Sequence, residues 1–225
     1  MKRDKISVNV IRRLPRYLRK LSELDTRGVD RISSGELGRQ MGLTPSQIRQ
    51  DFSCFGEFGQ QGYGYNVESL KREISSILGL TRDFSVILIG VGNLGRALIE
   101  NFNVVGLGYR LIGAFDIKSE LIGSTLGGIS ISHADDLPSF IEQNSIDIAI
   151  ITVTRQMARE TAELVADCGV RAIWNFTNLE LNLKAPGVIV EDIHFSDSLM
   201  VLSYYIAEAL EDESVHMNGG QHEKA

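Results

Sequence analysis

The sequence FSVILIGVGNLGRALIENF, residues 84–102, decides the fold class. Its apolar run from Phe84 to Ile89 has the length and β-branched content of a buried parallel strand. A glycine-rich turn follows, and the pattern then continues as a helix that begins near Asn93. A strand, a tight glycine turn and a helix in this order predict the first unit of a dinucleotide-binding domain.

The glycines follow the G-x-G-x-x-G pattern at Gly90, Gly92 and Gly95. The first permits the tight turn, the second lets a pyrophosphate approach the backbone, and the third lets the helix pack on the strand. Free N–H groups and the positive dipole end of the helix favour a phosphate here. The predicted cofactor-binding residues of this turn are Gly90, Val91, Gly92, Asn93, Leu94 and Gly95.

A carboxylate at the end of the next strand strengthens this interpretation. The run RLIGAFD ends at Asp116, about 20 residues beyond the last glycine, where an acid accepts hydrogen bonds from ribose hydroxyls. Because a 2′-phosphate would be repelled there, NAD+ and NADH are favoured over their phosphorylated forms. The alternative is an ordinary solvated acid at a strand end.

The alternation of strands and helices continues beyond this point. Residues 146–154, 170–176 and 187–193 read as strands, and residues 155–169 read as a helix that ends at a glycine. This alternation predicts an α/β fold with a Rossmann-like, doubly wound parallel sheet. Ligands bind at the carboxyl ends of such strands, although packing at strand ends explains the same residues equally well. The candidate nicotinamide-side residues are Thr152, Val153, Thr154, Asn175 and Phe176.

An enzyme that transfers a hydride also needs a proton donor or acceptor and room for a substrate. The predicted sheet ends near residue 193, which leaves no room for a substrate domain. His194 lies at a strand end without an obvious acidic or lysine partner in sequence, and no metal-ligand spacing is present. We therefore predict no catalytic site and no metal site. The alternatives are a small NAD-dependent dehydrogenase or reductase and a CoA-binding module, and Asp116 disfavours the second.

Charge is divided unevenly along a chain of ordinary soluble composition, with 43% hydrophobic residues and a net charge of −6. Residues 1–80 carry 14 basic and 9 acidic side chains, whereas residues 81–225 carry 9 and 20. A basic head on an acidic body predicts a polyanionic partner for the head alone.

The sequence also predicts a cytoplasmic location without membrane contact. No apolar run reaches the ~18 residues of a membrane span, and no signal-peptide core follows the basic N-terminus. The two cysteines, Cys54 and Cys168, form no disulfide framework. Because Cys54 lies between aromatic residues, we expect it to be a half-buried structural thiol.

Residues 32–52, ISSGELGRQMGLTPSQIRQDF, carry the start and stop signals of two short helices. Ser33 caps the first helix and Gly42 ends it, while Thr44 and Pro45 begin the second. Two such helices joined by a glycine-containing turn predict a helix-turn-helix, whose second helix enters the DNA major groove. A helical hairpin with a solvated face is the alternative.

The outward face of the second helix supplies the candidate base-reading residues. Ile48 and Phe52 are one turn apart and should face the core. Arginine pairs with guanine and glutamine with adenine, both through two hydrogen bonds. The side chains left facing outward are Ser46, Gln47, Arg49 and Gln50.

Two flanking segments support DNA binding. Residues 11–21, IRRLPRYLRKL, form a helix that is apolar on one side and basic on the other, which suits a phosphate backbone. Residues 56–67, GEFGQQGYGYNV, alternate glycine with aromatic residues, as expected of a short hairpin wing near a minor groove. The candidate contacts are Arg13 and Arg16 in the helix and Gln60, Gln61 and Gly62 in the wing.

Taken together, the two halves resemble the Rex family of redox-sensing transcriptional repressors over nearly the full length. The matching segments are RRLPRYLR, ISSGELG, SQIRQDFSCFGEFGQQGYGYNVESL, ILIGVGNLGRAL and NFTNLEL. The resemblance implies a homodimer whose winged-helix heads bind a palindromic double-stranded DNA operator. It also implies Rossmann domains that sense the ratio of NADH to NAD+, with NADH releasing the DNA. The nucleotide is then a signal rather than a reagent.

The resemblance also implies a domain-swapped last helix. Residues 196–210, SDSLMVLSYYIAEAL, have a broad apolar surface, and in this family the helix crosses into the partner subunit. Packing on its own Rossmann domain is the alternative. We thus expect a winged-helix domain at 1–80, an NAD(H)-binding domain at 81–195, and a dimerisation helix followed by a disordered tail at 196–225.

Three positions bear on how the family couples its domains. Arg19 matches an arginine that many members use in the first helix. Asn101 and His194 stand where those members have a tyrosine and an aspartate. The resemblance therefore leaves open which contacts connect the nucleotide to the DNA-binding head.

Overall fold

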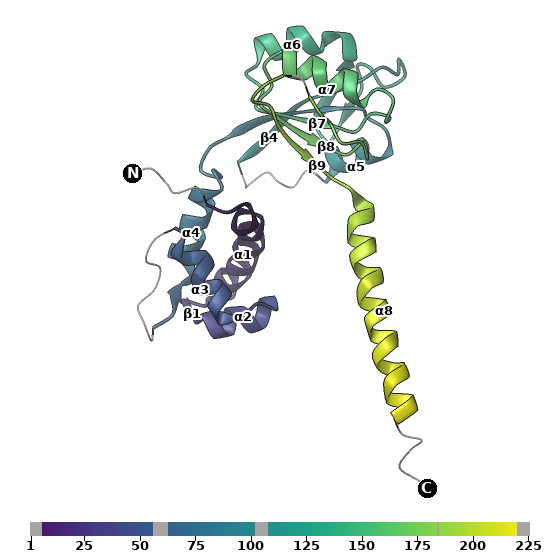
Figure 1. Ribbon diagram of the computed structural model, residues 1–225. Helices are drawn as coiled ribbons and strands as arrows, with labels where there is room; N and C mark the ends of the chain where they lie inside the picture. Colours follow the sequence, from purple (N-terminus) through teal and green to yellow (C-terminus); the bar gives the residue numbers. More distant parts are fainter. Residues whose placement is uncertain (1–5, 56–62, 102–107, 184, 220–225) are drawn as a thin grey trace. The chain divides into compact units, whose positions relative to one another are not determined.

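The computed structural model describes four segments of the chain, residues 6–55, 63–101, 108–183 and 185–219, with side chains through Glu211 (Figure 1). The chain divides into two compact units, Met1–Asp83 and Phe84–Ala225. The first unit is built around one hydrophobic core, and the second has a core on each face of its sheet.

The first unit, called the head from here on, is mostly helical. Its elements in chain order are α1 Val8–Thr26, β1 Arg31–Ile32, α2 Ser34–Met41, α3 Pro45–Ser53, β2 Tyr65–Asn66 and α4 Val67–Ile77. One side of α1 is apolar, and its Leu14 and Leu21 are fully buried. They share a core with Ile48 of α3 and Leu70 of α4. The amphipathic patterns of these helices thus meet in one interior.

The predicted helix-turn-helix is present in α2 and α3. The hydroxyl of Ser33 accepts a hydrogen bond from the Glu36 N–H at 3.0 Å, and the hydroxyl of Thr44 accepts one from the Gln47 N–H at 3.2 Å. Gly42 ends α2 in the left-handed conformation, with φ of 67°. These caps fix where each helix begins and where the first one ends.

The short sheet of the head pairs two segments that are distant in the sequence. Tyr65 and Asn66 pair antiparallel with Ile32 and Arg31, a segment more than thirty residues earlier. Gly64 has φ of 70°, and a Cβ there would lie 2.6 Å from the carbonyl oxygen of Ile32. The rest of the predicted hairpin, residues 56–62, lies outside the described residues, so the hairpin itself stays a prediction.

The second unit contains the sheet and the remaining helices. Its elements in chain order are β3 Phe84–Ile89, α5 Asn93–Glu100, β4 Tyr109–Asp116, β5 Thr125–Leu126, β6 Ile129–His133, the 3-10 turn η1 Ala134–Asp136, α6 Leu137–Gln143, β7 Ile148–Ile151, α7 Ala158–Asp167, β8 Ala172–Asn175, β9 Ile189–Asp192 and α8 Phe195–Gly219. The strand order is β5-β6-β4-β3-β7-β8-β9, and every neighbouring pair is parallel except β5 with β6. This is the predicted doubly wound sheet, and its order reverses between β3 and β7.

Side chains of the sheet alternate between two apolar layers. Ile87 and Ile89 of β3 belong to the core that also contains residues of α6 and α7, which lie together over one face (Figure 1). Val86 and Leu88 belong to the opposite core, with Ile99 of α5. Burial on both faces explains why this strand is a continuous apolar run.

Two strands and one helix of the sheet region were not predicted. β5 and β6 are joined at Gly127 and Gly128, both with positive φ, and α6 begins with Pro138 in its first turn. Each element is short, so its pattern is weaker than that of the long strands and helices. The missed elements complete the edge of the sheet beyond β4 without changing its fold class.

The last helix, α8, carries many apolar side chains that its own chain leaves exposed. The large apolar residues with more than half of their surface exposed are Phe195, Leu199, Met200, Val201, Leu202, Tyr204, Tyr205, Ile206 and Leu210. Packing of this helix on its own Rossmann domain, the alternative considered above, is therefore not seen for these residues apart from Phe195, whose ring contacts Phe176. The helix continues to Gly219, whereas the sequence predicted a disordered tail from Glu211. A helix that has already nucleated can extend into polar residues at little cost.

Candidate nucleotide site and DNA-binding face

The glycine turn between β3 and α5 has the shape of a phosphate cradle. Gly90 has φ of 97°, and a Cβ there would lie 2.7 Å from the backbone nitrogen of Val153. A Cβ on Gly95 would overlap the carbonyl oxygen of Gly90. Gly92 is different, because a Cβ there would meet no atom within 4 Å. The first and third glycines are therefore required by packing, whereas the second faces open space that a ligand can enter.

The N-terminus of α5 leaves donors available at this turn. Gly92 is its N-cap residue and provides no side-chain hydrogen bond. The first N–H groups of a helix without such a cap need another acceptor, and an anion supplies one. Asn93 is exposed at the first position, Leu94 is half-buried, and Val91 is buried in the core below. The residues present thus fit a dinucleotide pyrophosphate.

Asp116 lies at the end of β4 and is tied to this turn. Its carboxylate is only 8% exposed, and Oδ2 accepts a hydrogen bond from the Val91 N–H at 2.6 Å. Oδ1 accepts a second from the Lys118 N–H at 2.9 Å. A carboxylate has about four acceptor positions, so two remain for ribose hydroxyls. Asp116 is therefore not the freely solvated acid of the alternative interpretation.

A cavity of about 360 Å³ opens beside Asp116 at the carboxyl ends of β3, β4 and β7. Thr152 borders it, and its hydroxyl donates to the carbonyl oxygen of Gly90 at 2.6 Å. The sequence-predicted residues brought together around this cavity are Gly90, Gly92, Asp116, Thr152, Val153 and Thr154. Other lining residues were missed, among them Lys118, Asp135, Met157 and Leu164. Met157 and Leu164 are seven residues apart, the spacing that places two side chains on one face of a helix.

Asn175 and Phe176 lie elsewhere. Asn175 is 1% exposed, and its amide donates to the Leu179 carbonyl oxygen at 2.7 Å and to Asp192 Oδ1 at 2.6 Å. Its oxygen accepts from both the N–H and the hydroxyl of Thr177, at 3.1 and 2.7 Å. All four of its hydrogen-bonding positions are thus filled by the protein, which leaves none for nicotinamide in this conformation, and the predicted contact stays a prediction.

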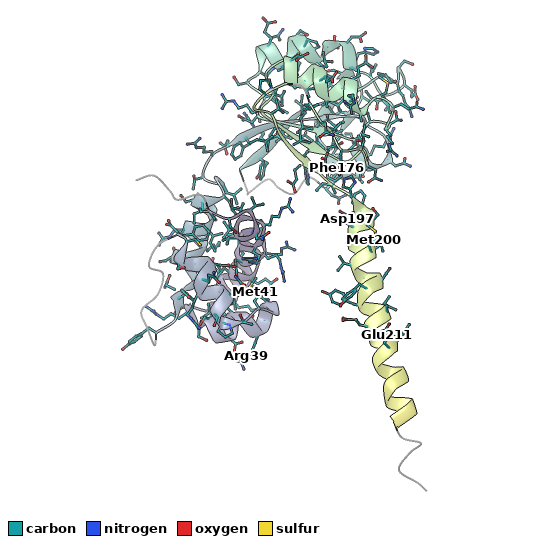
Figure 2. All side chains as sticks on the ribbon, viewed as in Figure 1. Arg39, Met41, Phe176, Asp197, Met200 and Glu211 are labelled. Carbon is teal, nitrogen blue, oxygen red and sulfur yellow. The ribbon has the colours of Figure 1, made fainter. Side chains whose placement is uncertain are left out.

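Phe176 is half-buried among aromatic rings. It lies near the start of α8 (Figure 2). Its ring packs against Trp174 with ring centres 4.7 Å apart and against Phe195, the first residue of α8, at 6.1 Å. It does not border the cavity beside Asp116. In the structure Phe176 packs at the end of β8, which agrees with the alternative interpretation that these residues serve packing at strand ends.

In the head, three predicted base-reading side chains of α3 are exposed. They are Ser46, Arg49 and Gln50. The Arg49 guanidinium donates to the hydroxyl oxygens of Ser34 and Ser46 at 3.2 and 3.1 Å, which holds it across the helix-turn-helix surface. Arg16 is also exposed and donates to the carbonyl oxygen of Met41 at the end of α2 at 3.2 Å. These cations have remaining N–H donors for a polyanion.

Arg13 and Gln47 have a different position from the one predicted. Both Nε and Nη2 of Arg13 donate to the carboxylate of Asp51 at 2.7 Å, and Nε2 of Gln47 donates to it at 2.8 Å. The hydroxyl of Tyr17 donates to the same carboxylate at 2.8 Å. We call these four residues, Arg13, Tyr17, Gln47 and Asp51, the Asp51 clamp. These hydrogen bonds turn Arg13 and Gln47 towards Asp51, but both side chains stay partly exposed, so their predicted contact with DNA stays a prediction.

The hydrogen bonds of the clamp and the burial of its members also shift the pKa values of Asp51 and Tyr17. Burial by itself raises the pKa of Asp51, but the hydrogen bonds from Arg13, Tyr17 and Gln47 outweigh it, and the pKa lies below its ordinary value. Burial, together with the hydrogen bond to Asp51, raises the pKa of the Tyr17 hydroxyl. The network therefore holds one buried negative charge opposite the Arg13 guanidinium at neutral pH.

The comparisons with known proteins cover the whole chain. The redox-sensing transcriptional repressor Rex of Caldicellulosiruptor bescii is 49% identical over 209 residues, which is 93% of this chain and 96% of the relative. The chain belongs to the Rex family. Two family models match parts of it, one described as a putative DNA-binding protein N-terminus over residues 5–53 and one as a CoA binding domain over residues 81–179.

Solved structures of a Rex-family repressor called RSP have the same fold. RSP in complex with beta-NAD+ and operator DNA is 43% identical, covers 99% of this chain and 100% of its own, and has a TM-score of 0.86. RSP in complex with beta-NADH is 40% identical, covers 94% and 99%, and has the same TM-score. The two-unit organisation of this Rex-family chain is thus shared over its full length.

Some predicted features of this Rex-family chain stay untested, and the expected burial of Cys54 was wrong. Gln60, Gln61 and Gly62 lie outside the described residues. Cys54, expected to be half-buried, is exposed. Within the described segments, no group of three metal-ligating side chains occurs, and no helix has the length and apolarity to cross a membrane.

Asp51 is a buried charged residue of the head that the sequence analysis missed. It lies between Ile48 and Phe52 on the buried face of α3, where an acid interrupts an apolar pattern. Arg13 and Tyr17, four residues apart in α1, were the available signal for its partners. A charge at a core position requires such partners because burial without them is costly.

Proposed function

We propose that this chain is a transcriptional repressor whose hold on DNA is controlled by the ratio of NADH to NAD+. The observation that carries the proposal is the full-length similarity to RSP, which has been solved both with beta-NAD+ and operator DNA and with beta-NADH. The cradle at Gly92 and the helix-turn-helix of the head supply a matching site in each unit. The nucleotide acts here as a signal, and the chain is not an enzyme.

The nucleotide lies with its pyrophosphate at the open Gly92 position, against the N–H groups of Asn93 and Leu94. The two unused acceptor positions of Asp116 take hydroxyls of the adenosine ribose. Because Thr152, Val153 and Thr154 line the same cavity as Asp116, we assign them to the adenosine half rather than to nicotinamide. Asp116 disfavours a 2′-phosphate by charge repulsion, so the ligands are NADH and NAD+.

The DNA-binding head places α3 in the major groove. Arg49 is the strongest base-reading candidate, with Ser46 and Gln50 beside it, because all three are exposed on one helix. Arg16 binds a phosphate instead, since it lies on α1 at the end of α2. The wing residues 60–62 remain candidates for a neighbouring minor-groove contact.

A homodimer follows from α8. Its exposed apolar side chains are too many for a monomer in water, because exposed apolar patches of this kind mark interaction surfaces. We propose that α8 packs against a second copy of the chain, whose two heads then bind the two halves of a palindromic operator. NADH favours a dimer in which the two heads no longer match these half-sites. We propose a cytoplasmic location, and the DNA partner supports it.

One titration separates this proposal from the two alternatives. Labelled promoter DNA is bound by the full-length chain, and NADH, NAD+ or CoA is then added. We expect NADH to release the DNA and NAD+ and CoA to leave it bound. A dehydrogenase would instead oxidise NADH in the presence of a carbonyl substrate, and a CoA-binding module would respond to CoA alone. DNA that stays bound at saturating NADH contradicts the proposal.

A further inference from the structure

A buried carboxylate joins the two helices that matter most for DNA binding. Asp51 of α3 is fully buried, and each of its oxygens accepts two hydrogen bonds. Oδ2 takes those of Arg13 Nε and the Tyr17 hydroxyl, and Oδ1 takes those of Arg13 Nη2 and Gln47 Nε2. All acceptor positions of the carboxylate are therefore filled by the Asp51 clamp.

The spacing of the clamp residues restrains how α3 is turned. Arg13 and Tyr17 are four residues apart on α1, and Gln47 and Asp51 are four residues apart on α3. Residues at this spacing share one face of a helix, so a pair on α1 meets a pair on α3. The Tyr17 ring also packs on Phe52 with centres 4.9 Å apart. A rotation of α3 about its own axis would break several of these contacts together.

The clamp has a direct consequence for Gln47. Glutamine reads adenine only when its amide is turned to the base edge, where it uses both a donor and an acceptor. Here the amide nitrogen of Gln47 points to Asp51, 2.8 Å away on the buried side. Hydrogen bonds to a carboxylate are among the strong ones, so a base must replace a bond of similar strength. No such bond ties Arg49 to Asp51, because its guanidinium contacts the hydroxyl groups of Ser34 and Ser46 instead.

We propose that Asp51 is a positioning residue that decides which side chains of α3 read DNA. It holds Gln47 out of base readout, and it leaves that role to Ser46, Arg49 and Gln50. The inference rests on the proposed DNA-binding function. Asp51 itself touches no base, and it acts through the orientation of α3 and of the Gln47 amide.

The first test compares Gln47→Ala with Arg49→Ala on a set of operators changed one base pair at a time. Gln47→Ala should weaken binding to every sequence by one common factor of less than about tenfold, because it loses only a bond within the clamp. Its salt dependence should match the wild type, since no charge is removed. Arg49→Ala should instead lose about 5- to 150-fold discrimination at one base pair.

The second test releases Gln47 with Asp51→Asn, which keeps the size of the side chain but removes its charge. We expect a new preference at the base pair facing Gln47, and the double variant Asp51→Asn with Gln47→Ala should lose it again. Glu68→Gln is the matched control, because it removes an exposed charge on α4 of the same head. Circular dichroism confirms that each variant is folded.

Two results would overturn the inference. One is a Gln47→Ala variant whose base preference changes at a single base pair as much as that of Arg49→Ala. The other is a folded Asp51→Asn variant with the wild-type profile of base preferences. If Asp51→Asn does not fold, the Gln47→Ala profile decides alone. A wild-type protein that binds no sequence selectively would instead refute the proposed function.

Discussion

Replacement of Asp116 by alanine should weaken both the fold around the glycine turn and the binding of NADH. The carboxylate accepts from the N–H groups of Val91 and Lys118, at 2.6 and 2.9 Å. Lys118 is exposed, so water can replace the second bond. Val91 is buried, and its N–H loses a charge-assisted bond worth about 1.5–3 kcal/mol. For a chain of this length, the loss corresponds to a lower Tm by about 3–12 °C.

Thermal unfolding followed by circular dichroism measures the first effect, and calorimetric titration with NADH and NADPH measures the second. In Asp116→Ala, the affinity for NADH should fall. The difference in affinity between NADH and NADPH should narrow, because the charge that repels the 2′-phosphate is gone. Asp116→Asn keeps one acceptor oxygen, so its Tm should lie between those of the wild type and Asp116→Ala. Asp135→Ala is the matched control for stability, since this carboxylate borders the same cavity but is highly exposed.

Two outcomes would refute this reasoning about Asp116. An unchanged Tm in Asp116→Ala would mean that the carboxylate does not hold the glycine turn. A wild-type protein that binds NADPH as tightly as NADH would mean that Asp116 does not lie at the ribose.

Three further predictions concern the head and the last helix. Arg16→Ala should weaken binding to all DNA sequences alike and reduce the salt slope by about one unit, whereas an unchanged slope would remove it from the phosphate contacts. The pKa of Asp51 is lowered in the folded head, so its contribution to the free energy of unfolding is complete above about pH 4 and is lost as the pH falls below that value. The free energy of unfolding, measured with urea, should therefore fall more between pH 5 and pH 3 in the wild type than in Asp51→Asn. Equal decreases in the two proteins would contradict the lowered pKa. Deletion of residues 196–225 should leave NADH binding intact but abolish the dimer and the release of DNA, and a dimeric truncated chain that still releases DNA would exclude α8 as the link.

The sequence was informative where a pattern was long or a residue type was unusual. The strand and glycine turn at 84–95 combine a continuous apolar run with a specific spacing, and both recur in the structure. The caps of α2 and α3 were readable because Ser33, Gly42 and Thr44 each have a distinct local role. Local signals of this kind depend on a few neighbouring residues, so one sequence suffices to read them.

What the sequence could not give was the choice among long-range partners. Gln47 is polar, close to a helix N-terminus and next to exposed residues, yet it turns inward because Asp51 lies one turn away. Asn175 follows a buried strand as ligand-binding residues do, yet it is used by Thr177 and Asp192. In both cases a buried polar group needs partners, and the partners come from tertiary packing.

The proposed function requires a thermodynamic coupling between the nucleotide and the operator. A closed binding cycle measures this coupling directly. The Kd of a labelled palindromic operator is measured by fluorescence anisotropy without nucleotide and with saturating NADH. The Kd of NADH is measured by calorimetry for the free protein and for the operator complex. We predict that NADH raises the operator Kd by about 5- to 150-fold and that the operator raises the NADH Kd by the same factor. An operator Kd that stays unchanged while calorimetry shows NADH bound would contradict the account.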